Sequence, residues 1–387
     1  MLFITACAVI LIVYFIYSRH FRKNALNGLS YTTKTSTHEI FEGDDFYFYE
    51  HIENAKNMPL PNIRVETQLP YGLDFCLYSD NARGNTRSTT RPYVESVFVL
   101  KPNNSVERRW RINARKRGVY YIGSVRVAVS DLFGITKIYT HFDSKRSMEN
   151  RITVLPKSLN IEKIFAPATD PYGDISTVFN LLSDPLAVAG AREYMPGDPI
   201  NKINWKSTAR LMKPMVNIEE HNEKCSYDVI FNIQSHQRET EGSTPQNSEI
   251  SEMGISLCSS LINECCVKGI SVRLFSNCKS GEEQDEYFTS PEYKDRGDLM
   301  PAMRMLAEMN TLISCRFEKL LELLLKDEAI DDNRSVIVIS PYIDNELVEF
   351  SKILLARGIN ISVFVTSHRS ASIDLPKQLD VYYKTYK

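Results

Sequence analysis

The sequence lacks the short motifs by which common enzymes are recognised. It contains neither the Gly-x-Ser-x-Gly elbow of serine hydrolases nor the Gly-x-x-x-x-Gly-Lys loop of nucleotide hydrolases. Its seven histidines are scattered, and none forms a pair at the helical spacing typical of metal ligands. We therefore predict no catalytic residue, no cofactor and no enzymatic activity.

The sequence also has little net charge and no patterned cysteines. A formal net charge of −2 argues against bulk attraction to nucleic acid. A cluster of basic residues surrounds Trp110: Arg108, Arg109, Arg111, Arg115, Lys116 and Arg117. Alternation along a strand would place these residues on two different faces of a sheet. We interpret them as a solvated sheet face or a face turned toward anionic lipid. The eight cysteines have no zinc-site spacing, which is typical of reduced thiols in the cytosol. No nucleic-acid partner is predicted.

One long apolar run stands at the start of the sequence. Residues 2–17 carry no charge, and four basic residues follow at once: Arg19, His20, Arg22 and Lys23. A cleaved signal peptide would have its positive charges before the run and small residues at its end. We therefore predict an uncleaved single-pass anchor, with residues 1–18 in the cell membrane; a buried helix of a soluble domain is the alternative. The positive-inside rule then predicts that the bulk of the chain is cytoplasmic.

The remaining sequence indicates a multidomain protein. Residues 24–156 contain short apolar or alternating runs separated by turn residues, at 46–49, 63–66, 94–100, 109–114, 119–122, 125–129 and 152–155. Such short strands without a helical period favour an all-β immunoglobulin-like sandwich. Residues 1–23 form the anchor with its basic flank, 157–221 a linker with a charged motif, and 222–387 a further domain.

The pattern of residues 222–387 is that of an α/β domain. Strands are expected over 227–233, 270–275, 335–340 and 359–365, and helices over 249–268, 299–309, 315–326 and 344–357. Gly269 and Gly358 each stand between a helix and a strand. Glycine at this joint is typical of a doubly wound sheet.

Residues 187–221 combine a capped helix with an unusual set of charged and aromatic residues. Asp198 is a good N-cap and Pro199 suits the first helical position, so we predict a helix from Pro199 to about Met212. The candidate residues are Arg192, Tyr194, Gly197, Asp198, Trp205, Lys206, Arg210, Glu219 and Glu220. They fit a capped linker helix with internal ion pairs, an inter-domain network or a partner-binding patch. Trp205 is expected to be buried because so large an apolar ring usually is.

The order Arg-x-Tyr-x-x-Gly-Asp, Ile-x-Trp-Lys-x-x-Ala-Arg and a Glu pair resembles the signature of the domain-of-unknown-function family fifty-eight. The segments Arg115 to Tyr120 and Asp131 to Gly134 resemble a second recurring stretch of that family. The resemblance implies that the last domain is von Willebrand factor A-like. It also implies a MoxR-type AAA+ ATPase as protein partner, in bacterial envelope or stress-related assembly. Members often have two membrane helices where this chain shows one.

A von Willebrand factor A-like domain raises the question of a metal site. Such domains often hold Mg²⁺ with Asp-x-Ser-x-Ser after the first strand, because a hard cation prefers carboxylate and hydroxyl oxygens. Here Asn232 and Gln234 replace the leading acid and a hydroxyl, and Ser340 follows the later strand, while Asp344 resembles an N-cap. We predict a degenerate site without metal.

The function predicted from the sequence is that of a non-enzymatic scaffold or partner-binding protein at the membrane. A metal-dependent adhesion-type module is one alternative. A hydrolase using Asp198, Glu219 and Glu220 is another, although adjacent glutamates on a strand would point in opposite directions.

Overall fold

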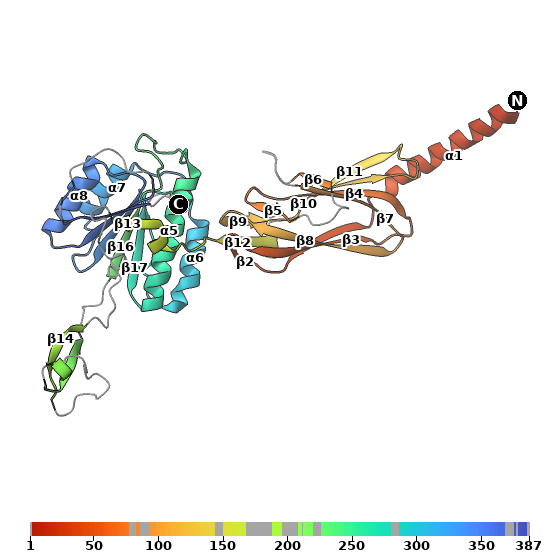
Figure 1. The fold of residues 1–387 in the computed structure, drawn as a ribbon. Coiled ribbons are helices and arrows are strands. Elements are labelled where there is room, and N and C mark those ends of the chain that lie inside the picture. The colour runs from red at the N-terminus through yellow and green to blue at the C-terminus, as the bar shows by residue number, and fades with distance from the viewer. Residues whose placement is uncertain are drawn as a thin grey trace. The chain divides into compact units, whose positions relative to one another are not determined.

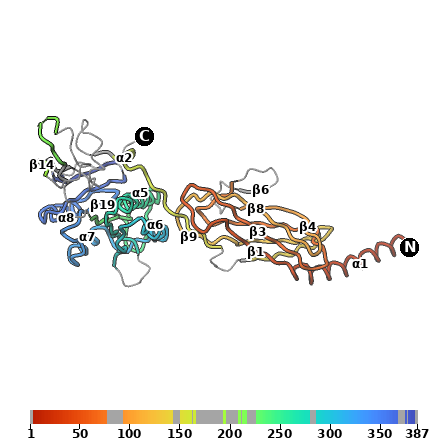
Figure 2. The backbone as a smooth tube through the Cα atoms, turned by 90° about the horizontal axis from the view of Figure 1, so that it is seen from below, coloured from red at the N-terminus to blue at the C-terminus, as the bar shows by residue number. Residues whose placement is uncertain are grey.

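The computed structural model describes residues 2–76, 83–85, 93–143, 150–167, 188–195, 208–210, 212–219, 226–279, 286–367, 375–376 and 378–384. The chain divides into two compact units. The first holds residues 1–157 with 306–308, and the second holds 158–305 with 309–387. Figures 1 and 2 show the elements of each unit.

The apolar run at the start of the chain is one helix, α1 (Leu2–Asn24). This helix is long and apolar enough to cross a membrane, as predicted. It continues past the end of the uncharged run at Tyr17, and its last turns pack on the strands that follow. Phe21 and Ala25 are fully buried in a core with Ile52, Leu60 and Val127. Earlier side chains such as Ile10 and Phe15 are exposed.

Two antiparallel sheets share that core, and a third sheet closes a second core beside it. One sheet has the order β1-β3-β8-β5, another β11-β10-β4-β7-β6, and the third β2-β12-β9. Alternate residues of β3 and β8 are buried, as period-two strands require. The predicted β-rich, immunoglobulin-like region is confirmed at this level, as two sheets around one core. The strands are β1 (Leu29–Thr35), β2 (Glu39–Phe41), β3 (Asp45–Asn54), β4 (Leu60–Gln68), β5 (Leu73–Phe75), β6 (Arg83–Asn85), β7 (Tyr93–Leu100), β8 (Asn104–Ala114), β9 (Gly118–Tyr121), β10 (Ser124–Ser130), β11 (Lys137–Asp143) and β12 (Arg151–Leu155).

The second unit is built on a seven-stranded sheet of order β13-β21-β20-β19-β16-β17-β18. The five neighbouring strands β21, β20, β19, β16 and β17 pair in parallel. The first of them along the chain, β16, lies inside the sheet between β19 and β17, which is the strand order of a doubly wound sheet. They are β16 (Ser226–Phe231), β17 (Ser271–Ser276), β19 (Ser335–Ser340), β20 (Ile361–Val365) and β21 (Asp380–Lys384). Antiparallel edges are added by β13 (Phe165–Pro167) and β18 (Phe288–Thr289).

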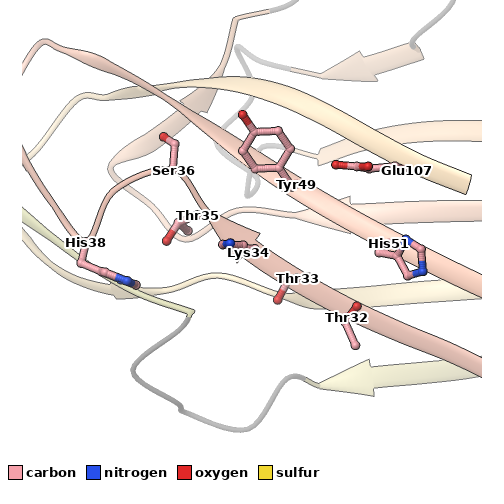
Figure 3. A pocket seen from close by; sticks show the side chains of 9 residues that line it. All are labelled: Thr32, Thr33, Lys34, Thr35, Ser36, His38, Tyr49, His51 and Glu107. Carbon is pink, nitrogen blue, oxygen red and sulfur yellow. The ribbon is translucent and has the colours of Figure 1, made fainter.

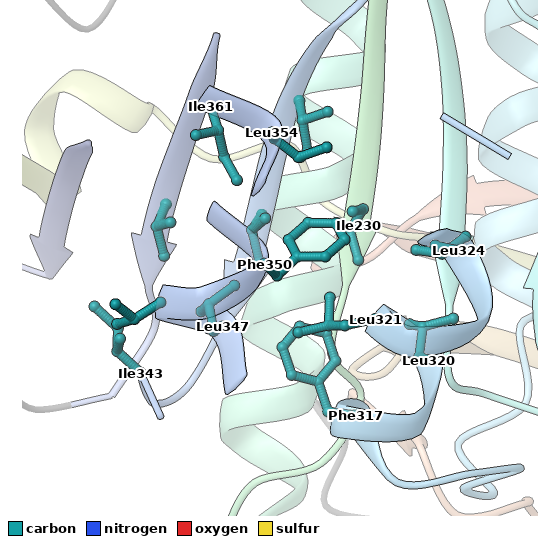
Figure 4. Packing of buried hydrophobic residues seen from close by; sticks show 14 of the residues in the cluster. Ile230, Phe317, Leu320, Leu321, Leu324, Ile343, Leu347, Phe350, Leu354 and Ile361 are labelled. Carbon is teal, nitrogen blue, oxygen red and sulfur yellow. The ribbon is translucent and has the colours of Figure 1, made fainter. Parts of the chain in front are cut away.

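Helices cover both faces of this sheet. Ile230 and Val338 lie on the face that packs against Phe317 and Leu320 of α7 (Phe317–Lys326) and Phe350 of α8 (Asn345–Ala356), in one apolar cluster (Figure 4). The other helices are α2 (Ile161–Ile164), α5 (Ser248–Lys268), α6 (Leu299–Glu308) and the 3-10 turn η3 (Arg296–Asp298).

Phe231 lies on the opposite face and touches α5. A Cβ added to Gly254 would stand 2.3 Å from the Phe231 ring, so only glycine allows α5 to approach this closely. Gly269 ends the same helix with φ 72°, the left-handed conformation that glycine adopts without strain.

A buried ion cluster joins the central strands. Asp228 of β16 is fully buried and accepts two hydrogen bonds from Arg273 of β17, at 3.0 and 2.8 Å. Arg334, just before β19, lies 2.7 Å from the same carboxylate and donates to the Tyr227 carbonyl at 3.1 Å. The side chain of one acid therefore ties three consecutive positions of the sheet.

Candidate functional site

The polar residues that follow the central strands meet at the point where the strand order reverses. β16 lies between β17 on one side and β19 on the other. Connections from adjacent strands leave in opposite directions there, which is where doubly wound sheets bind ligands. Asn232 follows β16, Asn277 follows β17, and Ser340 ends β19. We call these residues, with Gln234, the strand-end cluster.

The strand-end cluster is a closed hydrogen-bond network. Asn232 donates to the Ser340 hydroxyl at 3.1 Å, and its carbonyl oxygen accepts from the Gln234 backbone at 3.1 Å and from Asn277 at 3.3 Å. Asn277 in turn accepts from the Ile233 backbone at 2.8 Å. All four cluster residues are at most 1% exposed. Their amides thus satisfy one another and the strand ends.

Gln234 links the cluster to neighbouring segments. Its side-chain oxygen accepts from the Phe317 backbone N–H at 2.7 Å, at the first residue of α7. Its amide donates to the Glu239 carbonyl at 3.0 Å. The Glu239 carboxylate accepts from the backbone N–H groups of Ser235 and Gln246, both at 2.7 Å. The loop of residues 235–247 is therefore fastened to the strand end.

This arrangement does not fit a divalent cation. The structure brings together the three residues of the predicted degenerate site, Asn232, Gln234 and Ser340. Their oxygens, however, accept or share hydrogen bonds within the cluster, and none is a carboxylate. Mg²⁺ requires oxygen ligands in near-octahedral geometry, usually with at least one carboxylate. No metal-dependent reaction is therefore assigned to Asn232, Gln234 and Ser340.

Asp344 follows β19 and stands at the start of α8. It caps α8 by accepting the Leu347 N–H at 2.8 Å, as predicted. Its other oxygen is buried and has no hydrogen-bond partner among the described residues. Burial raises the pKa of Asp344 to about 6; the bond from Leu347 opposes the shift, and Glu346 and Glu318 add to it. Burial likewise raises the pKa of the nearby Tyr342 hydroxyl.

Burial makes Cys265 and Cys266 of the second unit poor nucleophiles at neutral pH. Burial raises the pKa of Cys265 to about 12 and that of Cys266 to about 11. A thiol reacts as its thiolate. Among the described residues, the cysteines form no disulfide with one another.

Two residues of the charged motif, Arg192 and Glu219, lie on a two-stranded antiparallel sheet of β14 (Val188–Glu193) and β15 (Met215–Glu219). Arg192 pairs with Val216 in this ladder, Tyr194 donates from its backbone to the Pro214 carbonyl at 2.9 Å, and Glu219 ends β15. Arg210 is exposed in the helical residues 208–210. Gly197, Asp198, Trp205, Lys206 and Glu220 lie outside the described residues, as does most of the predicted helix.

Sequence reasoning missed other contacts of this hairpin. Lys213 forms a 2.5 Å ion pair with Glu193. The Thr208 hydroxyl accepts the Met215 N–H at 2.9 Å. Met195 and Met212 are 63% and 89% exposed. No motif marked these residues, because their pairing depends on the strand register.

A groove of about 830 Å³ lies on the first unit along β1 and β3 (Figure 3). Its lining is mostly hydroxyl groups of Thr32, Thr33, Thr35 and Ser36, with Glu107 and His51 at one end. These groups do not converge on one point in Figure 3. The groove therefore offers a polar surface rather than a catalytic constellation.

Comparisons with solved structures give only remote likenesses. A non-cellulosomal cohesin from Archaeoglobus fulgidus is 13% identical with a TM-score of 0.21, over 30% of this chain and 94% of that one. A CARDB domain from Pyrococcus furiosus, in complex with di-metal ions, is 10% identical with a TM-score of 0.20, over 33% and 93%. Alpha-2-macroglobulin from Escherichia coli is 12% identical with a TM-score of 0.25, over 34% and 24%. These scores are too low to transfer any property.

The family comparison covers the second unit. No curated protein matches the chain. The strand-end cluster, strands β16 to β20 and most of the hairpin fall within one matched region, which supports the family resemblance of the charged motif. Residues 190–381 match the family described as "Protein of unknown function DUF58".

Proposed function

We propose that this protein is a membrane-anchored, non-enzymatic scaffold that binds a protein partner from the cytoplasmic side. The partner is a MoxR-type AAA+ ATPase, and the setting is bacterial envelope or stress-related assembly. The family match over residues 190–381 supports the resemblance from which this partner is inferred. The strand order of the second unit is compatible with a von Willebrand factor A-like domain, which the same resemblance implies.

The observation that carries the proposal is the hairpin of β14 and β15. Among the described strands, each pairs only with the other, and an isolated two-stranded sheet is marginally stable in water. Exposed Met195 and Met212 stand beside the Glu193–Lys213 ion pair. Methionine is adaptable and frequent at binding surfaces. An apolar, charge-flanked surface of this kind suits a protein partner.

The strand-end cluster supports a binding role over a chemical one. Its side chains are neutral, buried and mutually bonded. Neither alternative, a metal-dependent adhesion module or a hydrolase with Asp198, Glu219 and Glu220, gains a supporting observation among the described residues.

Affinity capture tests the proposal. The full chain in detergent would be immobilised and exposed to native bacterial extract with a non-hydrolysed ATP analogue or with ADP. We expect nucleotide-dependent recovery of an AAA+ ATPase, identified by mass spectrometry. Combining Met195→Asp with Met212→Asp should lower recovery about tenfold, as loss of central contacts does. Arg192→Ala and Asp198→Ala should also weaken capture.

The matched control is Val99→Asp, an apolar-to-acid change at a 61% exposed position of the first unit. It should leave recovery unchanged. Undiminished capture by all hairpin variants would reject the role of the motif. A folded bait that recovers no ATPase would reject the partner.

A further inference from the structure

The turn between β10 and β11 exposes large apolar side chains beside α1. Leu132, Phe133 and Ile135 are 70%, 69% and 70% exposed. The Phe133 ring meets Tyr14 of α1 edge-on, with centroids 5.6 Å apart. We call residues 131–136 the α1-facing turn. So much exposed apolar surface in one short turn marks an interaction site.

The α1-facing turn is rigidly held. Asp131 and Thr136 close it with a backbone hydrogen bond of 3.0 Å, and the Asp131 carboxylate accepts the Ile135 N–H at 2.9 Å. The Tyr14 hydroxyl donates to the same carboxylate at 3.0 Å. The hydroxyls of Ser18 and Thr136 bond at 2.7 Å. These hydrogen bonds fix the backbone of the turn, and with it the positions of Leu132, Phe133 and Ile135.

The length of α1 brings this turn to the bilayer surface. From Leu2 to Ser18 the helix rises about 26 Å at 1.5 Å per residue. The hydrocarbon core is about 30 Å thick. From Ser18 onward the helix is part of the protein core, since Ser18 is 8% exposed and Phe21 is fully buried. Exposed apolar side chains of α1 continue to Ile16 and burial begins at Ser18, so the turn that bonds to Ser18 lies at the level where the helix leaves the hydrocarbon layer.

A cavity of about 530 Å³ opens between α1 and the turn. Arg19, Arg22 and Lys23 contribute its cations, Ser18 and Thr136 its hydroxyls, and Ile135 part of its apolar wall. No carboxylate of a described residue forms an ion pair with these three cations. Basic pockets beside membrane helices bind anionic headgroups, and arginine matches phosphate geometry.

We propose that this cavity binds the phosphate of an anionic phospholipid while Leu132, Phe133 and Ile135 enter the membrane interface. The inference rests on the membrane anchoring proposed above. Charge complementarity selects an anionic headgroup, and continuity with the apolar face of α1 selects a lipid over a free phosphate. The acyl chains would continue along the exposed side of α1 at Phe15.

Lipid retention tests the headgroup site. The purified full chain in neutral detergent would be titrated with phosphatidylglycerol or phosphatidylcholine, and bound lipid counted by native mass spectrometry. We expect phosphatidylglycerol to bind about tenfold tighter. The variant with Arg19→Gln, Arg22→Gln and Lys23→Gln should lose this preference, whereas Arg64→Gln with Arg109→Gln should keep it. Glycerol phosphate should not compete at equal concentration.

Quenching by spin-labelled lipid tests the turn. In bilayers, the tryptophan of Phe133→Trp should be quenched, after subtraction of the wild-type signal. The tryptophan of Tyr71→Trp, at a 61% exposed position, should not be. Release of the protein by alkaline carbonate would reject the anchor itself. Retention in carbonate without quenching of Phe133→Trp, or equal binding of both lipids, would reject the lipid site alone. Competition by glycerol phosphate would show a free-phosphate site instead.

Discussion

At the scale of single residues, Asp344 is a buried carboxyl group of which the fold uses only one oxygen. That oxygen caps α8, while the other is buried without a partner among the described residues. Burial raises the pKa of Asp344 to about 6, above the value of about 3.9 in an unfolded chain. Between about pH 3.9 and pH 6, folding is therefore accompanied by the uptake of a proton at Asp344. The favourable contribution is complete below about pH 4 and is lost as the pH rises through about 6.

Asp344→Asn should stabilise the protein at neutral pH. The amide oxygen of the asparagine still accepts the hydrogen bond from the Leu347 N–H that caps α8, and the side chain no longer ionises. We expect the free energy of unfolding to rise by about 1–2 kcal/mol at pH 7.5 and to change little at pH 4. Urea unfolding of the full chain, followed by hydrogen exchange in α8, measures both. Asp332→Asn, on an exposed side chain, is the matched control. An equal gain at both pH values would contradict the assignment.

The strand-end cluster was only partly predictable. Asn232, Gln234 and Ser340 were grouped because the family resemblance aligns them with the metal site of von Willebrand factor A-type domains, and the structure brings them together. Asn277 and Glu239 were missed. Asn277 joins them because β17 lies beside β16, and a single sequence does not state which strands are neighbours. Glu239 lies in a stretch without periodicity, and its role depends on how that loop folds back.

At the scale of elements, the central strands are joined by Asp228. Its carboxylate is fully buried against Arg273 and Arg334. Removing one partner of a buried ion pair leaves uncompensated charge, whereas an exposed pair contributes little. The sheet therefore depends on this acid far more than on the surface pairs.

Asp228→Ala should destabilise the second unit by about 3–5 kcal/mol, because two arginines lose their partner. Glu264→Ala, which breaks the partly exposed pair with Lys268 one helical turn away, should cost below about 1 kcal/mol. Hydrogen exchange of β16 and β19 peptides in the full chain measures both. Similar losses for the two variants would refute the special role of Asp228.

Elements with strong periodicity were predicted closely, and polar ones were missed. The strand over 335–340 and the helix capped by Asp344 lie where apolar pattern and turn residues place them. β1 was missed because its interior residues are serine, tyrosine, threonine and lysine, and only its two ends are buried. Alternation correctly separates Arg108 from Arg109. The pairing of Arg108 with Glu50 follows from the register of β3 and β8, which composition does not contain.

At the scale of the whole molecule, the anchor predicts one topology. Basic residues follow the apolar run of α1, so the rest of the chain should be cytoplasmic. A green fluorescent protein fused after Lys387 should fluoresce in a bacterial host. Alkaline phosphatase at the same point should be inactive. Active phosphatase would reverse the proposed orientation and remove a cytoplasmic ATPase as a direct partner.

The last turns of α1 belong to the core of the first unit, where Phe21 and Ala25 pack with the strands. A domain joined to its anchor by a flexible linker samples many orientations relative to the membrane. In the first unit, the packing of Phe21 and Ala25 with the strands fixes the orientation of α1 relative to the sheets. Any tilt of the helix in the lipid becomes a tilt of the sandwich. If α1 spans the membrane as proposed, a change in bilayer thickness that tilts α1 tilts the first unit with it.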